Sequence, residues 1–221
     1  MKVSVVADIL KANDTIAREN RALFDRHGLT VFNLMSSPGS GKTCLLERTI
    51  PALKGEFHIG VIEGDIQGSL DAERLARYEI PIVQINTGGD CHLDANMIRN
   101  ALGSLKLAGL DLLFIENVGN LVCPAEFKVG EDAKVMILST PEGDDKPLKY
   151  PLMFLESSVL LINKIDLLPY LDTDLGRLKR AALGINPHLV IFEVSCTTGE
   201  GLEAWFDWVR GRVRSKLAAN R

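Results

Sequence analysis

The stretch that decides the fold is Ser36-Ser37-Pro38-Gly39-Ser40-Gly41-Lys42-Thr43. It follows an apolar run and opens a helical pattern, which is the setting of a phosphate-binding P-loop. The two glycines let the backbone curl so that successive N–H groups face phosphates, and the N-terminus of the helix adds its positive dipole. Ser36 stands where the first glycine of the motif is usual, so a residue with a Cβ must adopt that backbone geometry.

Outward from this loop, short β-branched runs alternate with helical patterns. The expected strands are Thr30–Met35, Phe57–Ile62, Ile82–Asn86, Leu110–Glu116, Lys134–Thr140, Val159–Asn163 and Leu189–Val194. The expected helices are Lys42–Leu53, Asp71–Tyr78, Asp94–Leu107, Thr173–Leu183 and Leu202–Leu217. Several strands are apolar along their whole length, as when helices cover both faces of a parallel sheet. The pattern predicts a doubly wound α/β domain with a mostly parallel sheet and a site at the carboxyl ends of its strands.

A further helical pattern, Ala7–His27, precedes the first strand and would end at Gly28. We expect this helix to pack on its own domain, and a dimer contact is the less favoured alternative. The chain is therefore expected to consist of an N-terminal helical appendage (residues 1–28) and a P-loop domain (residues 29–221).

Composition narrows the class of protein. The chain has 221 residues, 46% of them hydrophobic, and a formal net charge of −4. This charge argues against binding to nucleic acid or to an anionic membrane surface. No apolar run approaches the roughly 20 residues of a membrane helix, and no signal pattern opens the chain, so we expect a cytoplasmic protein. The four cysteines should then be reduced thiols that pack or bind metal.

Three acidic or hydroxyl side chains are candidates for a magnesium site. Lys42 would reach the β- and γ-phosphates, and the Thr43 hydroxyl would bind Mg²⁺. Glu116 ends a strand in Glu116-Asn117-Val118-Gly119, where Gly119 lets its N–H approach the γ-phosphate, and Asp65 lies just beyond the end of another strand, in Glu63-Gly64-Asp65. We expect Lys42, Thr43, Asp65 and Glu116 to be catalytic, with the last three holding Mg²⁺.

A second motif predicts which base is bound. Asn163-Lys164-Ile165-Asp166 follows a buried strand, and Asp166 can accept hydrogen bonds from the N1–H and N2–H₂ edge of guanine, which adenine lacks. Asn163 would tie this loop to the P-loop, and the segment after the next strand would cap the base. The expected nucleotide contacts are Ser37, Pro38, Gly39, Ser40, Gly41, Lys42, Thr43, Cys44, Gly119, Asn163, Lys164, Asp166, Ser195, Cys196 and Thr197.

A third group suits a softer metal. Cys91 and His92 are adjacent, and Cys123 follows the Glu116–Gly119 element. Two thiolates and an imidazole favour Zn²⁺ or Ni²⁺ over Mg²⁺ or Ca²⁺. Three ligands do not close a tetrahedral structural site, so the site would be open or shared between two chains. Spacing alone equally favours the alternative that the thiols are packing residues.

The position of Cys123 suggests a mechanism. It lies four residues after Gly119, so hydrolysis that relaxes this loop would move a metal ligand. Such coupling is reciprocal, and metal should also alter nucleotide binding or turnover. No glutamine follows Gly119 and the sequence offers no obvious arginine for the site, so unassisted hydrolysis should be slow.

In this order, the motifs resemble those of the HypB family of hydrogenase nickel-incorporation GTPases, in the SIMIBI class of P-loop proteins. The resemblance covers nearly the whole chain, and Glu116–Pro124 is its most specific stretch. It implies a GTP-dependent homodimer with Cys91, His92 and Cys123 at its interface. It also implies nickel delivery to the hydrogenase large subunit, with a HypA-type zinc-containing nickel chaperone as partner.

Two features depart from some family members, and two alternatives remain. The chain begins Met1-Lys2-Val3 without a His-rich or Cys-rich nickel motif, so storage is not expected, and Asn96 stands where some members have histidine. The nearest alternative is a urease-type nickel GTPase, against which Cys91-His92-Leu93-Asp94-Ala95 and Cys123 argue. From another class, the chain could be a nucleotide-gated metal-binding regulatory module without significant turnover.

Overall fold

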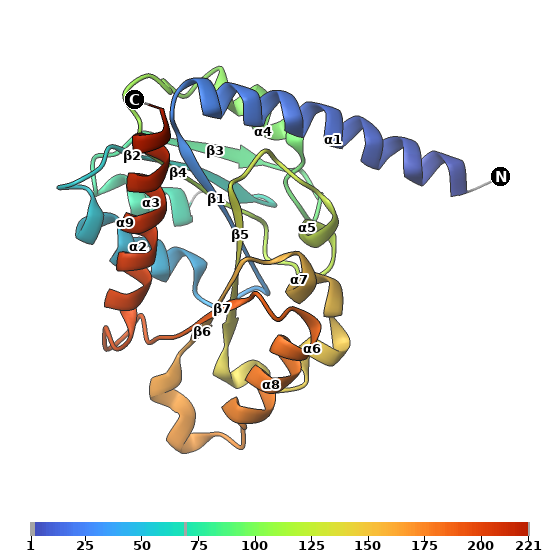
Figure 1. The fold of residues 1–221 in the computed structure, drawn as a ribbon, viewed down its shortest axis with the longest axis vertical. Helices are drawn as coiled ribbons and strands as arrows, with labels where there is room; N and C mark the ends of the chain where they lie inside the picture. The colour runs from blue at the N-terminus through green and yellow to red at the C-terminus, as the bar shows by residue number, and fades with distance from the viewer. Residues whose placement is uncertain (1–2, 69, 221) are drawn as a thin grey trace.

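A single seven-stranded sheet organises the molecule, in a computed structural model that describes residues 3–68 and 70–220 (Figure 1). The outermost residues of the two expected segments, 1, 2 and 221, and residue 69 therefore lie outside the described part. The strands are β1 (Thr30–Ser36), β2 (Ile59–Asp65), β3 (Ile82–Asn86), β4 (Leu112–Glu116), β5 (Ala133–Ser139), β6 (Val159–Asn163) and β7 (Val190–Glu193).

The strand order places a ligand crevice at β1. The order is β3-β2-β4-β1-β5-β6-β7, and every neighbouring pair is parallel. The chain winds first to one side of β1 and then to the other, and ligands bind outside the carboxyl ends of the strands at such a reversal. The expected doubly wound, parallel α/β fold is confirmed.

Helices cover both faces of the sheet. Successive side chains of a strand point to opposite faces, so each strand contributes to the core on either side. In β1, Phe32 and Leu34 enter the core on one face, whereas Val31 and Met35 enter the cores on the other. The first face is covered by α2 (Lys42–Leu53), α3 (Leu70–Ala76) and α9 (Leu202–Ala219). The other is covered by α1 (Val3–Arg26), α4 (Ala95–Leu102), α5 (Cys123–Glu126), α7 (Pro151–Glu156) and α8 (Leu175–Ile185).

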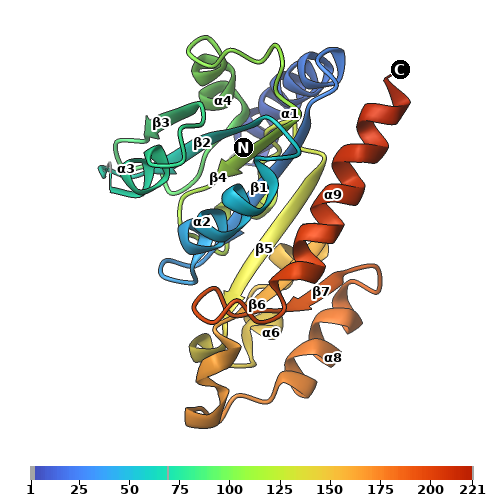
Figure 2. The same cartoon turned by 90° about the vertical axis from the view of Figure 1, so that its left-hand side faces the viewer.

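Short helical turns complete the described chain: η1 (Thr140–Glu142), α6 (Lys146–Lys149) and η2 (Ile165–Tyr170). Helix α1 lies alongside α4 in both views (Figures 1 and 2). No helix within the described residues is both long and apolar enough to cross a bilayer.

Several expected boundaries were wrong, and two of them bear on the site and the core. Strand β2 was expected to end at Ile62 but continues to Asp65, since Glu63 is buried and lies beside Glu116 of β4 in register. Helix α4 was expected to reach Leu107 but ends at Leu102. The turns that follow it still bury Leu105 and Leu107 in the core, so the apolar pattern there reflects burial without helix.

Candidate nucleotide and metal sites

The P-loop joins the carboxyl end of β1 to α2, and its two glycines both have positive φ, 75° at Gly39 and 104° at Gly41. Gly41 also permits a close approach, because a Cβ there would lie 2.4 Å from Nδ2 of Asn163. Ser36 needs no left-handed backbone, since Glu79 and Lys164 are the described non-glycine residues with positive φ. Its hydroxyl instead accepts a hydrogen bond from Lys42 Nζ at 2.9 Å.

The serines of the loop are braced by Glu142, a residue that the sequence did not single out. Ser37 donates to one carboxylate oxygen of Glu142, and Ser40 Oγ donates to the other at 2.7 Å. The same carboxylate accepts the backbone N–H of Ser139 at 2.8 Å. The Ser37 and Ser40 side chains therefore face the η1 turn, and their backbone remains the part of the loop available to phosphates.

A cavity of about 390 Å³ opens beside the P-loop at the ends of β2 and β4. Its walls contain loop, strand and helix residues: Pro38, Gly39, Gly41, Lys42, Thr43, Cys44, Glu63, Gly64, Asp65, Ile66, Asp71, Arg74, Glu116, Asn117, Val118 and Gly119. The four side chains expected to be catalytic are thus gathered around one space. Gly119 lies against the P-loop, where a Cβ would be 3.0 Å from the Cα and N of Pro38.

The acidic side chains of this cavity suit a cation. Thr43 Oγ1 donates to Glu116 Oε1 at 2.7 Å. The second oxygen of Glu116 and Oε2 of Glu63 are buried without a hydrogen-bond partner among the described residues. Burial, with Glu116 nearby, raises the pKa of Glu63 to about 8, and burial raises the pKa of Glu116 to about 7 against the opposing charge of Lys42. Unpaired buried carboxylate oxygens beside a hydroxyl fit Mg²⁺, for which Thr43, Asp65 and Glu116 were the expected ligands.

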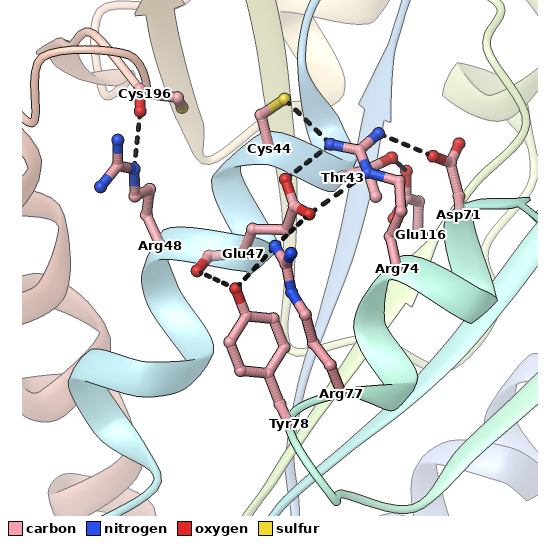
Figure 3. A network of polar contacts seen from close by, with 10 residues as sticks. All are labelled: Thr43, Cys44, Glu47, Arg48, Asp71, Arg74, Arg77, Tyr78, Glu116 and Cys196. Atoms are coloured by element: carbon pink, nitrogen blue, oxygen red, sulfur yellow. Dashed lines mark hydrogen bonds and ion pairs between the residues drawn. The ribbon is translucent and has the colours of Figure 1, made fainter.

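Arg74 of α3 also lines the cavity, although the sequence offered no obvious arginine for it (Figure 3). Its guanidinium bonds Glu47 at 2.6 Å and Asp71 at 3.0 Å, and lies 3.4 Å from Cys44 Sγ. Arg77 binds the same Glu47 carboxylate at 2.5 Å. These contacts hold α3 against α2. They also keep a cation at the rim of the cavity beside the P-loop, where phosphates are expected to bind (the phosphate cavity).

The Asn163–Asp166 motif, expected to bind the base, lines a second cavity that shares Gly39, Gly41 and Cys44 with the first. Asn163 Nδ2 donates to the Ser40 carbonyl at 2.9 Å, and its Oδ1 accepts from Cys196 N at 3.1 Å. Lys164 Nζ donates to the Gly39 carbonyl at 2.8 Å. The end of β6, the P-loop and the segment after β7 are therefore joined through one buried amide.

Asp166 lines this second cavity, and one of its carboxylate oxygens accepts a hydrogen bond. Ser195 Oγ donates to Asp166 Oδ1 at 2.5 Å, which orients the carboxylate. Arg48 of α2 donates to the carbonyls of Cys196 and Thr197 at 2.7 and 2.8 Å and fixes the capping segment (Figure 3). Burial raises the pKa of the Cys196 thiol to about 12, so this cysteine contributes backbone and packing.

The third candidate group lies beyond the Glu116–Gly119 loop. The possible ligand atoms of Cys91, His92 and Cys123 all lie within 4.8 Å of one another. The two sulfurs are 3.0 Å apart, and His92 Nδ1 is 3.9 Å from Cys91 Sγ. All three residues are half-buried, and His92 packs on Phe127 with ring centroids 4.0 Å apart. Burial lowers the pKa of His92, which favours the neutral imidazole that binds metals.

Comparison with known proteins places the chain. A family model described as the CobW/HypB/UreG nucleotide-binding domain matches residues 30–193. The hydrogenase maturation factor HypB of Rhizobium leguminosarum bv. viciae is 51% identical over 98% of this chain and 74% of its own length. The probable hydrogenase maturation factor HypB of Methanocaldococcus jannaschii is 40% identical over 96% of each chain.

Solved structures agree with this. The crystal structure of HypB from Helicobacter pylori in complex with nickel superposes with a TM-score of 0.88 at 39% identity, covering 92% of this chain and 96% of that one. The signal recognition particle receptor FtsY from Elizabethkingia anophelis, at a TM-score of 0.55 and 16% identity, shares the fold alone. Both findings confirm the expected SIMIBI-class P-loop fold. The chain therefore belongs to the HypB family, within the CobW/HypB/UreG nucleotide-binding proteins.

Proposed function

We propose that the chain is a GTP-hydrolysing metallochaperone that assists nickel insertion into the hydrogenase large subunit during maturation. The observation that carries the proposal is the cluster of Cys91, His92 and Cys123, two thiols and an imidazole within 4.8 Å. Cys123 lies four residues after Gly119, which packs on the P-loop. A soft metal site and a phosphate site thus share one loop.

The nucleotide is GTP. Asp166, oriented by the bond from Ser195 to its Oδ1, keeps carboxylate lone pairs that can accept from the guanine N1–H and N2–H₂ groups, whereas adenine would leave them unpaired. Asn163 and Lys164 hydrogen-bond to the P-loop, so the residues that bind the base and those that bind the phosphates are held together. Phosphate contacts come from the P-loop backbone together with Lys42.

Hydrolysis of GTP would use the groups around the first cavity. Lys42 neutralises charge on the β- and γ-phosphates. Thr43, Asp65 and Glu116 would hold Mg²⁺, which offsets the negative charge that develops on the phosphates. No glutamine follows Gly119 to orient a water, so turnover by the chain alone should be slow.

Nickel is the proposed cargo, bound by Cys91, His92 and Cys123. Three protein ligands leave a coordination position open for transfer to another protein or for a ligand from a second copy. We therefore propose a GTP-dependent homodimer that meets at this site, and delivery to the hydrogenase large subunit with a HypA-type nickel chaperone. The names of the HypB relatives support service to hydrogenase, and the nickel complex of the Helicobacter pylori protein supports nickel as the cargo.

Two alternatives make different predictions. A relative from Helicobacter hepaticus, 42% identical, is named a hydrogenase/urease maturation factor, so service to urease is the nearest alternative. A nucleotide-gated regulatory module that does not turn over is the alternative from another class. Nickel transfer assayed in parallel into apo-hydrogenase and apo-urease separates the first, and phosphate release separates the second.

The testing experiment is phosphate release from GTP and ATP, with sedimentation of the protein in GDP and in a non-hydrolysable GTP analogue. The parent should hydrolyse GTP slowly and form more dimer with the analogue. Lys42→Ala and Thr43→Ala should lose hydrolysis and keep their circular dichroism spectrum, because both side chains face the cavity. Hydrolysis at the parent's rate in these variants would overturn the enzyme assignment.

A further inference from the structure

One buried side chain, Asn117, hydrogen-bonds to two segments at the same time. One is the Glu116–Gly119 loop beside the P-loop (the nucleotide loop), and the other is Cys91–Leu93 (the metal segment), which carries two of the candidate metal ligands. Asn117 Oδ1 accepts the backbone N–H of Leu93 at 2.9 Å and that of Val118 at 3.0 Å. Leu93 directly follows His92, and Val118 directly precedes Gly119. Since a carbonyl oxygen has two lone pairs, both acceptor positions of Asn117 are occupied by these two N–H groups.

Asn117 is itself held in a fixed orientation. It is 1% exposed, and its Nδ2 donates to Oδ1 of Asn33, a β1 residue that is 0% exposed, at 3.1 Å. Asn33 in turn donates to Glu131 at 3.4 Å. A buried amide in such a network cannot turn without leaving polar groups unpaired, which is costly in a low-dielectric interior.

The nucleotide end of this contact lies in the phosphate cavity. Val118 and Gly119 both line that cavity, and Gly119 touches Pro38 of the P-loop. A γ-phosphate that draws the Gly119 N–H toward it must move the neighbouring Val118 N–H. That motion pulls on the oxygen that also holds Leu93.

The metal end is equally confined. Leu93 is 0% exposed and packs on Gly64 of β2, where a Cβ would lie 2.6 Å from the Leu93 side chain. Gly64 lines the phosphate cavity as well. The backbone at Leu93 therefore has little room to adjust independently, and a shift there is passed to His92.

We propose that Asn117 is the positioning residue through which nucleotide state sets the geometry of the Cys91–His92 half of the metal site. Cys123 follows Gly119 along the chain, so the two halves of the site are reached by two routes that start from one loop. This inference rests on the proposed function, because it requires both a nucleotide and a metal to bind.

Helix α1 supplies a matched control. Asn20, 2% exposed, donates to the carbonyls of Ala95 at 2.8 Å and Val129 at 3.1 Å, and so holds segments on both sides of the metal site. Neither of these carbonyls belongs to the Glu116–Gly119 loop. Asn20→Ala should loosen the metal site in every nucleotide state, whereas Asn117→Ala should reduce the difference between states.

The test is a competition titration of Ni²⁺ against a chromophoric chelator, in GDP·Mg²⁺ and in a GTP analogue with Mg²⁺. In the parent the two nickel Kd values should differ by at least about fivefold, the lower end of usual allosteric coupling. In Asn117→Ala the ratio of the two values should fall by at least about twofold, because only the route through Cys123 remains, whereas Asn20→Ala should weaken both and keep the parent's ratio. Hydrogen exchange in the unaltered protein gives a second measurement: protection of the Leu93 amide should differ between the two nucleotide states.

Each outcome decides. If Asn117→Ala keeps the parent's ratio, or if Leu93 exchanges identically in both states, the inference is overturned. A parent that binds nickel with one Kd in both states also overturns it, and leaves the metal-binding GTPase proposal standing. A parent that binds no nickel overturns both.

Discussion

Replacing Gly41 by alanine should destabilise the nucleotide-free protein for two separable reasons. At φ 104° an alanine carries the strain of the left-handed region, about 1–2 kcal/mol. In addition, the new Cβ would lie 2.4 Å from Asn163 Nδ2, so Asn163 must move.

The cost of that movement follows from the contacts of Asn163. It donates to the Ser40 carbonyl and accepts from Lys164 N and Cys196 N, at 2.9, 2.8 and 3.1 Å. At about 1 kcal/mol for each hydrogen bond, their loss amounts to about 2–3 kcal/mol beyond the backbone strain. The free energy of unfolding should fall by about 3–5 kcal/mol in total.

Gly39 gives the matched control, since its φ is 75° and an added Cβ would meet no described atom within 4 Å. In Gly39→Ala the free energy of unfolding should fall only by the backbone strain, as measured by urea unfolding without nucleotide. The double variant Gly41→Ala/Asn163→Ala should lose about 2–3 kcal/mol less than the sum of the single variants, because each removes the same hydrogen bonds. Equal losses in Gly41→Ala and Gly39→Ala, or strict additivity in the cycle, would refute the reasoning.

Three further predictions concern the nucleotide. Parent GTP affinity should exceed ATP affinity by at least ~10²-fold, and Asp166→Asn should weaken GTP and improve xanthosine triphosphate in a competition titration; unchanged ranking would contradict the base site. Arg74→Ala should slow single-turnover hydrolysis by about tenfold or more, because a cation at the cavity rim offsets phosphate charge; an unchanged rate would leave Arg74 a structural residue. The pKa values of about 8 for Glu63 and about 7 for Glu116 mean that both are partly protonated at neutral pH. Since a bound cation favours the ionised carboxylate, Mg²⁺·GTP binding should release protons and weaken as pH falls below about 8; calorimetric heats independent of buffer ionisation enthalpy would contradict this.

Contiguous motifs explain how much of the site the sequence could predict. The P-loop and Asn163–Asp166 carry their geometry in adjacent residues, and their positions relative to the strands follow from the α/β pattern. Glu142 could not be found this way, because it reaches Ser40 across 102 residues of sequence through the β1–β5 pairing. Glu63 was missed because a charged residue inside an apolar run suggests a strand end, whereas β2 continues through it.

Helix length shows a similar limit. The apolar positions after Leu102 suggested a longer α4, but burial of Leu105 and Leu107 requires only that the chain return to the core. Asn33 and Asn117 are ordinary polar residues in sequence, and their importance comes from burial in a network that joins β1, β4 and the metal segment. Such roles depend on tertiary contacts, and local pattern does not reveal them.

The most direct test of the account is equilibrium Ni²⁺ titration of the parent, Cys91→Ala and Cys123→Ala, with folding checked by circular dichroism. Cys44→Ala is the matched control, because Cys44 is also half-buried but lies outside the Cys91–His92–Cys123 cluster. We expect nickel affinity to fall at least ~10-fold in Cys91→Ala and in Cys123→Ala, since even the loss of a group that hydrogen-bonds a metal ligand costs about that much, and we expect Cys44→Ala to bind like the parent. Parent-like nickel binding by both cluster variants would mean that these thiols are packing residues, and would contradict the assignment of Cys91, His92 and Cys123 as the nickel site.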